Sequence, residues 1–206
     1  MVDLFIATSI NSKIFLDNNP LIFGKLSSKK LLEVRNNIRN EYETIIVGGN
    51  TIKKDNPTLL NTNKSNIRII VDKYADLDIN SKIFTTMPER TNIILLKKND
   101  KYKEKLLSIG VNVIYLESIE EKEIIKTIKK IAIGKILVEG GSKTICMFLK
   151  NNFINNIRII QFPIIFPQDA LSFEKFNNLI INCKLKESFI IDNKYIYECY
   201  KIDKNK

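Results

Sequence analysis

Short runs rich in β-branched residues alternate along this chain with longer segments in which apolar residues recur at helical spacing. Such an alternation is typical of α/β proteins, in which helices pack on a largely parallel sheet. The predicted strands are Leu4–Thr8, Thr44–Val47, Ile67–Val71, Asn92–Leu96, Asn112–Leu116, Lys135–Glu139 and Ile157–Phe162. Several of them are apolar throughout, which indicates strands that are covered on both faces.

The C-terminal part of the chain follows a different pattern. Lys186–Ile191 and Tyr195–Ile202 flank the turn-forming pair Asp192-Asn193. Two strands joined by so short a turn form an antiparallel hairpin. We therefore expect a mixed, mostly parallel sheet with an antiparallel C-terminal hairpin.

Three segments have the apolar spacing of helices, namely Ser28–Arg39, Ser118–Ile131 and Ser142–Asn151. In the second of them, Ser118 and Glu121 have the spacing of a capping box, in which each side chain bonds the backbone amide of the other residue. Its isoleucines recur on one face, so this helix is predicted to be part of the scaffold.

The composition excludes several kinds of chemistry. The chain has 206 residues and no histidine, which rules out Ser–His and Cys–His pairs and histidine-ligated zinc. Cys146, Cys183 and Cys199 lack metal-ligand spacing, so we expect no metal site and reduced thiols in a cytoplasmic protein. No apolar run approaches the roughly 18 residues that span a bilayer. Val2–Ile10 lacks the basic leader and cleavage site of a signal peptide.

The chain is strongly basic, with 33 Lys and Arg against 23 Asp and Glu and a net charge of +10. Such a charge attracts anions, including phosphorylated substrates, nucleotide cofactors and nucleic acids. A cluster of lysines supports the last class: Lys97, Lys98, Lys101, Lys103 and Lys105. No nucleic-acid-binding motif and no Trp accompany them, so a nonenzymatic polyanion-binding module is the weaker alternative.

Two predicted strands end in a Gly-Gly pair that is followed by hydroxyl-bearing residues, within Ile45–Thr51 and Ile136–Thr144. Glycine lets the backbone approach a ligand closely, and the start of the following helix offers free amides to a phosphate. Neither segment matches a complete nucleotide-binding fingerprint, and each alone also fits a purely structural turn. Together they predict a nucleotide-like anion bound between two turns at one edge of the sheet.

Three charged residues lie next to these turns. Asp55 precedes Asn56-Pro57, where it either caps a turn or faces a ligand. Glu139 follows an apolar strand, at the end of a sheet where α/β proteins bind ligands, although an exposed strand terminus also explains it. Lys13 follows the first strand and belongs to the same edge if the loop turns back.

The order of these motifs resembles the reductase domain of riboflavin biosynthesis, a family with a dihydrofolate-reductase-like fold. The matching motifs are Ser9-x-x-x-Lys13, Arg39, Val47-Gly48-Gly49-Asn50-Thr51-Ile52-x-x-Asp55-Asn56-Pro57-x-Leu59, Arg68-Ile69-Ile70-Val71-Asp72, Val138-Glu139-Gly140-Gly141-Ser142 and Phe162-Pro163-Ile164-Ile165. The resemblance covers the chain from about Leu4 to Ile202. It implies a three-layer α/β/α domain over residues 1–206, without the zinc deaminase domain of bifunctional relatives, and a cytoplasmic homodimer.

The resemblance also implies an activity: NADPH-dependent reduction of a ribosylamino-pyrimidine 5′-phosphate to the ribitylamino form, by hydride transfer to C1 of the opened ribose. The cofactor-binding residues would be Thr8, Thr51, Asp55, Lys73, Gly140, Gly141, Ser142, Lys143 and Thr144. The substrate-binding residues would be Asn11, Lys13, Arg39, Leu59 and Glu139. Lys13, Glu139 and Asp55 would be catalytic, and Lys73 would favour the 2′-phosphate of NADPH over NADH.

The chain departs from the family pattern in two places. The usual Ser-x-Asp-Gly-Lys loop reads Ser9-Ile10-Asn11-Ser12-Lys13, and the arginine that many members carry after the Asp-x-Pro segment is missing. Either Lys64 or Arg39 with other lysines would then hold the substrate phosphate. These changes keep open a related reductase that acts on a pterin-like or carbonyl substrate. Within the flavin pathway, the diamino and deaminated pyrimidines remain alternatives.

Overall fold

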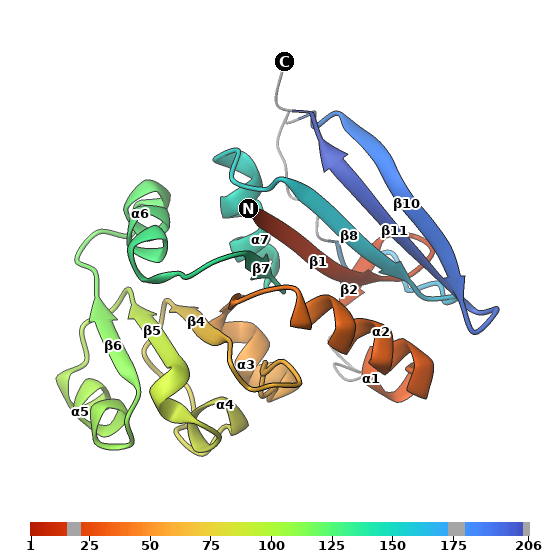
Figure 1. Ribbon diagram of the computed structural model, residues 1–206. Coiled ribbons are helices and arrows are strands. Elements are labelled where there is room, and N and C mark those ends of the chain that lie inside the picture. The colour runs from red at the N-terminus through yellow and green to blue at the C-terminus, as the bar shows by residue number, and fades with distance from the viewer. Residues whose placement is uncertain (16–21, 173–179, 204–206) are drawn as a thin grey trace.

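The computed structural model describes residues 1–15, 22–172 and 180–203, and one large sheet organises them (Figure 1). Its strands are β1 Val2–Thr8, β3 Thr44–Gly48, β4 Ile67–Asp72, β5 Thr91–Leu95, β6 Asn112–Tyr115, β7 Ile136–Val138, β8 Asn156–Gln161, β10 Cys183–Ile191 and β11 Tyr195–Ile202. Their order across the sheet is β10-β11-β8-β1-β7-β3-β4-β5-β6. All neighbours from β8 to β6 are parallel, whereas β11 is antiparallel to both β8 and β10. The expected mixed sheet with a C-terminal hairpin is confirmed.

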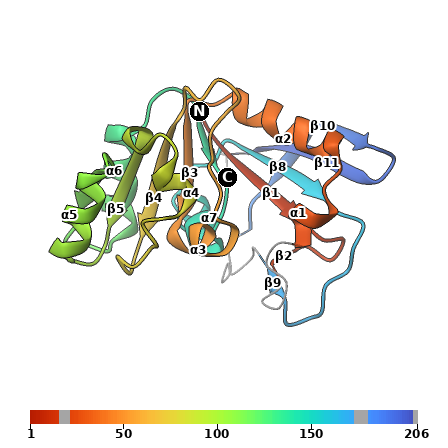
Figure 2. The ribbon, with the colours of Figure 1, turned by 90° about the horizontal axis from the view of Figure 1, so that it is seen from below.

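Helices cover both faces of this sheet, so the three-layer α/β/α architecture is also confirmed. The helices are α1 Ile22–Leu26, α2 Lys29–Asn40, α3 Gly49–Asp55, α4 Lys82–Thr85, α5 Asp100–Ser108, α6 Glu121–Ile131 and α7 Ser142–Lys150, with a 3₁₀ turn at Pro88–Arg90. Residues of α2 to α5 pack in one apolar cluster and residues of α6 and α7 in another. Figure 2 shows the small sheet of β2 (Lys13–Phe15) and β9 (Leu171–Ser172) projecting beside α1.

The alternation of side chains along the strands explains the two clusters. Ile45 and Val47 of β3 belong to the cluster under α2, while Ile46 between them belongs to the cluster under α6 and α7. Successive side chains of a strand point to opposite faces, so a strand buried on both sides must be apolar at every position. All five residues of β3 are buried accordingly.

One expectation about the helices was wrong, and one of the longer helices was missed. The capping box at Ser118 does not form: α6 begins at Glu121, and Ser118 Oγ instead accepts from the Glu120 amide at 3.1 Å. The Glu121 carboxylate instead accepts from Asn151 Nδ2, which follows the end of α7, at 2.8 Å. Helix α5 was not predicted; Asn99 caps it by accepting from the Tyr102 amide at 3.1 Å.

The described residues hold no helix that is long and apolar enough to cross a membrane. Within the same three ranges, no cluster of at least three His, Cys, Asp or Glu side chains is arranged to hold a metal ion. Cys146 and Cys199 are buried and Cys183 is exposed, and no disulfide joins them.

Candidate functional site

The two Gly-Gly turns meet at the carboxyl edge of the sheet. Strands β3 and β7 pair in parallel, with Thr44 opposite Ile136 and Ile46 opposite Val138, so their ends lie side by side. The Gly48 amide donates to the Gly140 carbonyl at 3.3 Å and ties the turns together. The prediction that two segments distant in the sequence converge at one edge is confirmed.

Close packing between the turns explains why they consist of glycine. A Cβ on Gly48 would lie 2.7 Å from Thr144 Oγ1, a distance that real Cβ atoms do not show. Gly140 and Gly141 have φ angles of +143° and +77°, a backbone region that residues with side chains rarely adopt. The turns therefore need glycine for both space and backbone geometry.

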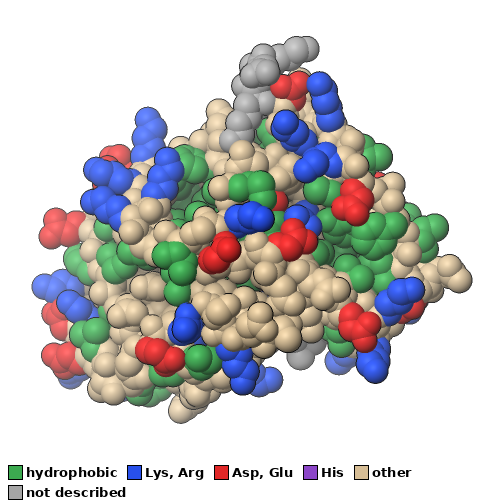
Figure 3. All heavy atoms as spheres, in the orientation of Figure 1, with side chains coloured by type: hydrophobic (Ala, Val, Ile, Leu, Met, Phe, Trp, Pro, Cys, Tyr) green, Lys and Arg blue, Asp and Glu red, His purple; other side chains and the backbone are tan. Residues whose placement is uncertain are grey.

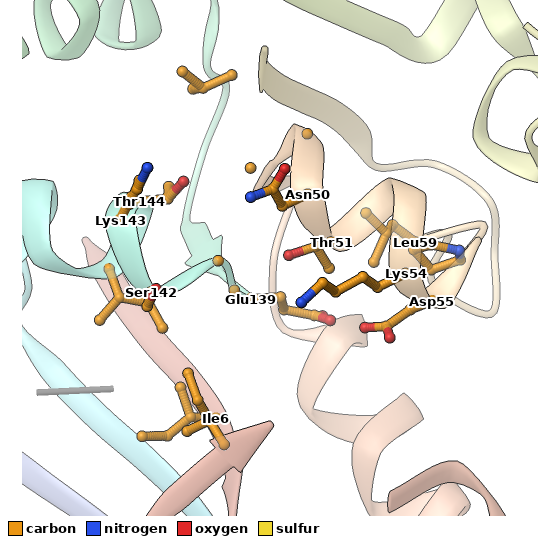
Figure 4. Close-up of a pocket in the computed structure, with 18 of the residues that line it drawn as sticks. Ile6, Asn50, Thr51, Lys54, Asp55, Leu59, Glu139, Ser142, Lys143 and Thr144 are labelled. Atoms are coloured by element: carbon orange, nitrogen blue, oxygen red, sulfur yellow. The ribbon is translucent and has the colours of Figure 1, made fainter. Parts of the chain in front are cut away.

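A cleft of about 830 Å³ opens beside the turns. Figure 4 shows its two sides, with Ser142, Lys143 and Thr144 of α7 facing the segment that carries Thr51 and Asp55 of α3, and with Glu139 between them. The predicted site residues that line the cleft are Arg39, Thr51, Asp55, Leu59, Lys73, Glu139, Gly140, Gly141, Ser142, Lys143 and Thr144. The fold thus brings together most of the predicted site.

The start of α7 presents backbone amides to the cleft. Its N-cap is Gly141, which makes no side-chain capping bond, and the first intrahelical bond shown there runs from the Ile145 amide to the Gly141 carbonyl at 3.0 Å. The amides of Ser142, Lys143 and Thr144 precede this bond and have no partner within the helix. Together with the positive end of the helix dipole, they suit a phosphate group.

Glu139 and Arg39 form a bidentate ion pair in the wall of the cleft. Arg39 Nε donates to Glu139 Oε1 and Arg39 Nη2 to Glu139 Oε2, both at 2.6 Å. Their side chains are only 7% and 12% exposed, respectively. Burial lowers the pKa of Arg39, but the charge and hydrogen bonds of Glu139 outweigh it and raise that pKa overall. The pair fixes the orientation of the carboxylate at the end of β7.

Asp55 ends α3 at the rim of the cleft. The helix stops there because Asn56 adopts a left-handed conformation, with a φ of +41°, ahead of Pro57. Shielding from water by the cleft walls raises the pKa of Asp55, and the nearby cations of Arg35 and then Lys54 oppose this effect. Asp55 therefore holds a proton more readily than an aspartate in water.

The carboxyl end of β4 forms the far end of the cleft. Asp72 is 1% exposed; its Oδ1 accepts from the Tyr74 amide at 3.1 Å, and its Oδ2 has no hydrogen-bond partner among the residues described. The exposed Lys73 places its Nζ 5.8 Å from the centre of the Tyr74 ring. This end thus combines a hydrogen-bond acceptor, a cation and an aromatic face.

Leu59 is held against the cleft by a buried arginine. Arg68 of β4 donates from Nη1 to the Thr58 carbonyl at 2.9 Å and from Nη2 to the Thr86 carbonyl at 2.8 Å. Leu59 is 2% exposed and has a φ of +54°. The segment after α3 is therefore fixed to the sheet before any ligand binds.

Three predicted site residues do not line the cleft: Thr8, Asn11 and Lys13. Thr8 is buried at the end of β1, where its carbonyl accepts from the Phe162 amide at 2.7 Å. Asn11 exchanges hydrogen bonds with the backbone of Phe166, at 2.8 and 3.1 Å. Lys13 Nζ donates to the Gln168 carbonyl at 2.9 Å and to Ser172 Oγ at 3.0 Å. Asn11 and Lys13 join the first loop to residues 166–172.

Arg35 and Asp72 are two of the residues that line the cleft without having been predicted. Arg35 precedes Arg39 by four positions on α2, so both share one helical face, and that spacing was the available signal. Asp72 ends a buried strand beside a glycine turn, as Glu139 does, and the same reasoning applied to Glu139 would have found it.

The fold and the cleft together define a dihydrofolate-reductase-like α/β protein with a groove suited to a dinucleotide. The chain belongs to the RibD C-terminal domain family, which matches residues 4–197. Over 142 residues it is 34% identical to the riboflavin biosynthesis protein RibD of Aquifex aeolicus; this covers 67% of the chain but only 40% of that relative. It is 24% identical to a 2,5-diamino-6-ribosylamino-4(3H)-pyrimidinone 5′-phosphate reductase of the same organism, with 95% of the chain and 96% of the relative covered.

Solved structures confirm the fold. A pyrimidine reductase-like protein from Corynebacterium diphtheriae superposes with a TM-score of 0.83 at 20% identity, over 99% of this chain and 92% of that one. A dihydrofolate reductase from Enterococcus faecalis superposes with a TM-score of 0.56 at 14% identity, over 98% and 96%. The expected dihydrofolate-reductase-like architecture is thereby confirmed.

Proposed function

We propose that this chain reduces a ribosylamino-pyrimidine 5′-phosphate to the ribitylamino form with NADPH, as a step of riboflavin biosynthesis. The observation that carries the proposal is the convergence of the two glycine turns beside the Arg39–Glu139 pair in one cleft. Support also comes from the relative that aligns over nearly its whole length, whose name states this reductase activity.

The cleft fits a dinucleotide cofactor. The amides at the start of α7, which have no partner within the helix, suit its pyrophosphate. The unpaired Asp72 Oδ2 suits a ribose hydroxyl, and Lys73 suits the 2′-phosphate that distinguishes NADPH from NADH. Thr51, Ser142, Lys143 and Thr144 would hold the remaining polar groups. Bound there, NADPH supplies a hydride to C1 of the opened ribose.

Ring opening is the step in which the protein's own groups act. The C1–O4 bond of the ribose breaks, a proton is added to O4, and the amine nitrogen loses a proton, which leaves an imine. The Glu139 carboxylate accepts two bonds from Arg39 and keeps lone pairs for sugar hydroxyls. We propose that Glu139 and Arg39 bind the opened sugar and that Leu59 packs against it.

Asp55 is the proposed proton carrier. Its raised pKa brings it nearer to the range in which a carboxyl group both donates and accepts a proton. Lys13 remains a proposed substrate contact, which requires that its bonds to Gln168 and Ser172 be released. Asn11 and Thr8 would act through the loop that they stabilise. We also propose a single reductase domain over residues 1–206, a cytoplasmic location and a homodimer.

The test is NADPH oxidation with the diamino and the deaminated ribosylamino-pyrimidine phosphates, measured side by side with the purified chain. We expect turnover with one of them, together with saturable binding of NADPH at micromolar concentration. Binding of NADPH without turnover of either compound would refute the substrate and leave a related reductase. Failure to bind NADPH would refute the reductase class altogether, and sedimentation in the same buffer gives the oligomeric state.

The polyanion-binding alternative gains no specific support. Figure 3 shows Lys and Arg side chains interspersed with Asp and Glu over the visible face, without a continuous basic stripe. Nucleic-acid binding relies on such a stripe and on aromatic stacking. RNA binding with a steep salt dependence, in the absence of NADPH binding, would favour this alternative.

A further inference from the structure

Arg35 is a cation in the cleft wall that no carboxylate among the described residues contacts directly. Its side chain lines the cleft from α2, one helical turn before Arg39. Arg39 donates two hydrogen bonds to Glu139, whereas Arg35 makes no hydrogen bond or ion pair within the described ranges. An arginine half-buried in a cavity without a carboxylate partner is costly unless a ligand supplies the anion.

The charges around Arg35 leave an excess of positive charge. The cleft is lined by six cations and four carboxylates, which gives 6 − 4 = +2 before a ligand binds: Arg35, Arg39, Lys54, Lys73, Lys82 and Lys143 against Asp55, Asp72, Glu121 and Glu139. Burial, followed by repulsion from Arg39, lowers the pKa of Arg35, and Glu139 and Asp55 only partly oppose this. The guanidinium still carries its charge at neutral pH, because arginine does not deprotonate in proteins.

The position of Arg35 assigns it to the substrate rather than to the cofactor. The charged groups that act on it are Arg39, Glu139 and Asp55, which surround the proposed sugar site. Lys73, which suits the 2′-phosphate of the cofactor, is not among these charged groups. Arg35 therefore faces the part of the cleft in which the ribose chain of the substrate would lie.

Lys64, the lysine that the sequence offers for the substrate phosphate, is not available for an anion there. Lys64 lies in the segment between Leu60 and β4. Its side chain is exposed and does not line the cleft. The same segment is closed on itself, because Asn61 Oδ1 accepts from the Ser65 amide at 2.9 Å and the Thr62 amide donates to Asn40 Oδ1 at 2.8 Å. It presents no cation to the cavity.

We propose that Arg35 binds the phosphomonoester of the substrate and makes the enzyme selective for the 5′-phosphorylated compound over its nucleoside. The inference rests on the proposed function and adds the group that recognises the phosphate. Guanidinium and phosphate form short, charge-assisted, bidentate hydrogen bonds, which a neutral nucleoside cannot replace.

The test compares kinetics with the phosphorylated substrate and with the same compound after removal of its phosphate. Arg35→Ala should raise KM for the phosphorylated compound roughly 10- to 100-fold, the usual effect of losing hydrogen bonds to a charged group. Its KM for the nucleoside and its Kd for NADPH should stay within twofold of the parent. Arg35→Lys should restore part of the loss, and Lys64→Ala, a matched surface cation, should change neither KM.

If Arg35→Ala raises KM equally for the phosphorylated compound and for the nucleoside, or raises neither, Arg35 does not recognise the phosphate. If the parent turns over neither pyrimidine, the proposed function has failed, and the role of Arg35 is then measured by titration with ribose 5-phosphate and inorganic phosphate. Weaker binding of both anions to Arg35→Ala than to Lys64→Ala supports an anion site at Arg35. Equal binding to the two variants refutes it.

Discussion

The contact between the two glycine turns can be tested with one added methyl group. In Gly48→Ala, the new Cβ would lie 2.7 Å from Thr144 Oγ1 and would force β3 and α7 apart. Gly48 has φ and ψ angles of −84° and 152°, which suit any residue, so the cost is steric alone. Overpacking of this kind costs about 1–3 kcal/mol, or about 2–12 °C in Tm for a domain of this size.

The measurements are Tm by differential scanning fluorimetry and Kd for NADPH by fluorescence quenching. We expect both a lower Tm and weaker NADPH binding, because the same displacement opens the turns that suit the pyrophosphate. Gly24→Ala is the stability control, because its added Cβ meets no atom within 4 Å.

A second substitution, Thr144→Ala, isolates the contact between positions 48 and 144. In Gly48→Ala combined with Thr144→Ala, the nearest side-chain atom at position 144 is its Cβ, at the ordinary distance of 3.9 Å. The double variant should therefore be about as stable as Thr144→Ala alone, which gives a coupling energy of about 1–3 kcal/mol. A Gly48→Ala protein as stable as Gly24→Ala, with unchanged NADPH affinity, would show that the turns do not pack as described.

Three further predictions concern charged groups of the cleft. Glu139→Gln removes the charge that Arg39 holds and should slow single-turnover reduction by roughly 10²-fold; a rate within twofold of the parent would eliminate Glu139 from the chemistry. Burial raises the pKa of Asp72, so its ionisation destabilises the fold as pH rises above the ordinary value of about 3.9. Asp72→Asn should accordingly gain Tm over the parent between about pH 4 and pH 7, and a constant Tm difference would contradict this sign. Lys73→Ala should weaken NADPH binding severalfold and leave NADH binding unchanged, and an unaltered ratio of the two Kd values would remove the role of Lys73.

Much of the fold followed from local pattern because the sheet is buried on both faces. A strand such as Ile45–Val47 has no polar position, and that continuous apolar run separates it from an amphipathic helix. Helix starts were less predictable. Ser28 caps α2 by accepting from the Leu31 amide at 3.2 Å, whereas the equally plausible Ser118 does not cap α6. Glu121, the carboxylate that a capping box would use, accepts from Asn151 after the end of α7 instead.

The site residues also divide into those that a local sequence pattern predicts and those that it does not. The two Gly-Gly pairs, Asp55 and Glu139 were identifiable because they lie at or just after the ends of buried strands, where α/β sheets bind their ligands. The first loop was different: Lys13 has the spacing of a ligand contact, but its Nζ binds the backbone near Gln168. The partner of a long side chain depends on segments far away in the chain, and no local pattern encodes them.

The amino-acid sequence by itself determined the alternation of buried strands and helices, the glycine turns at the strand ends and hence the kind of ligand they suit. Those properties depend on backbone freedom and on apolar periodicity, which act over a few residues. Only the tertiary structure decided which charges share the cleft, since it pairs Arg39 with Glu139, leaves Arg35 without a carboxylate and excludes Lys64. The energy of a charge depends on its distance from other charges and from water, and folding sets both.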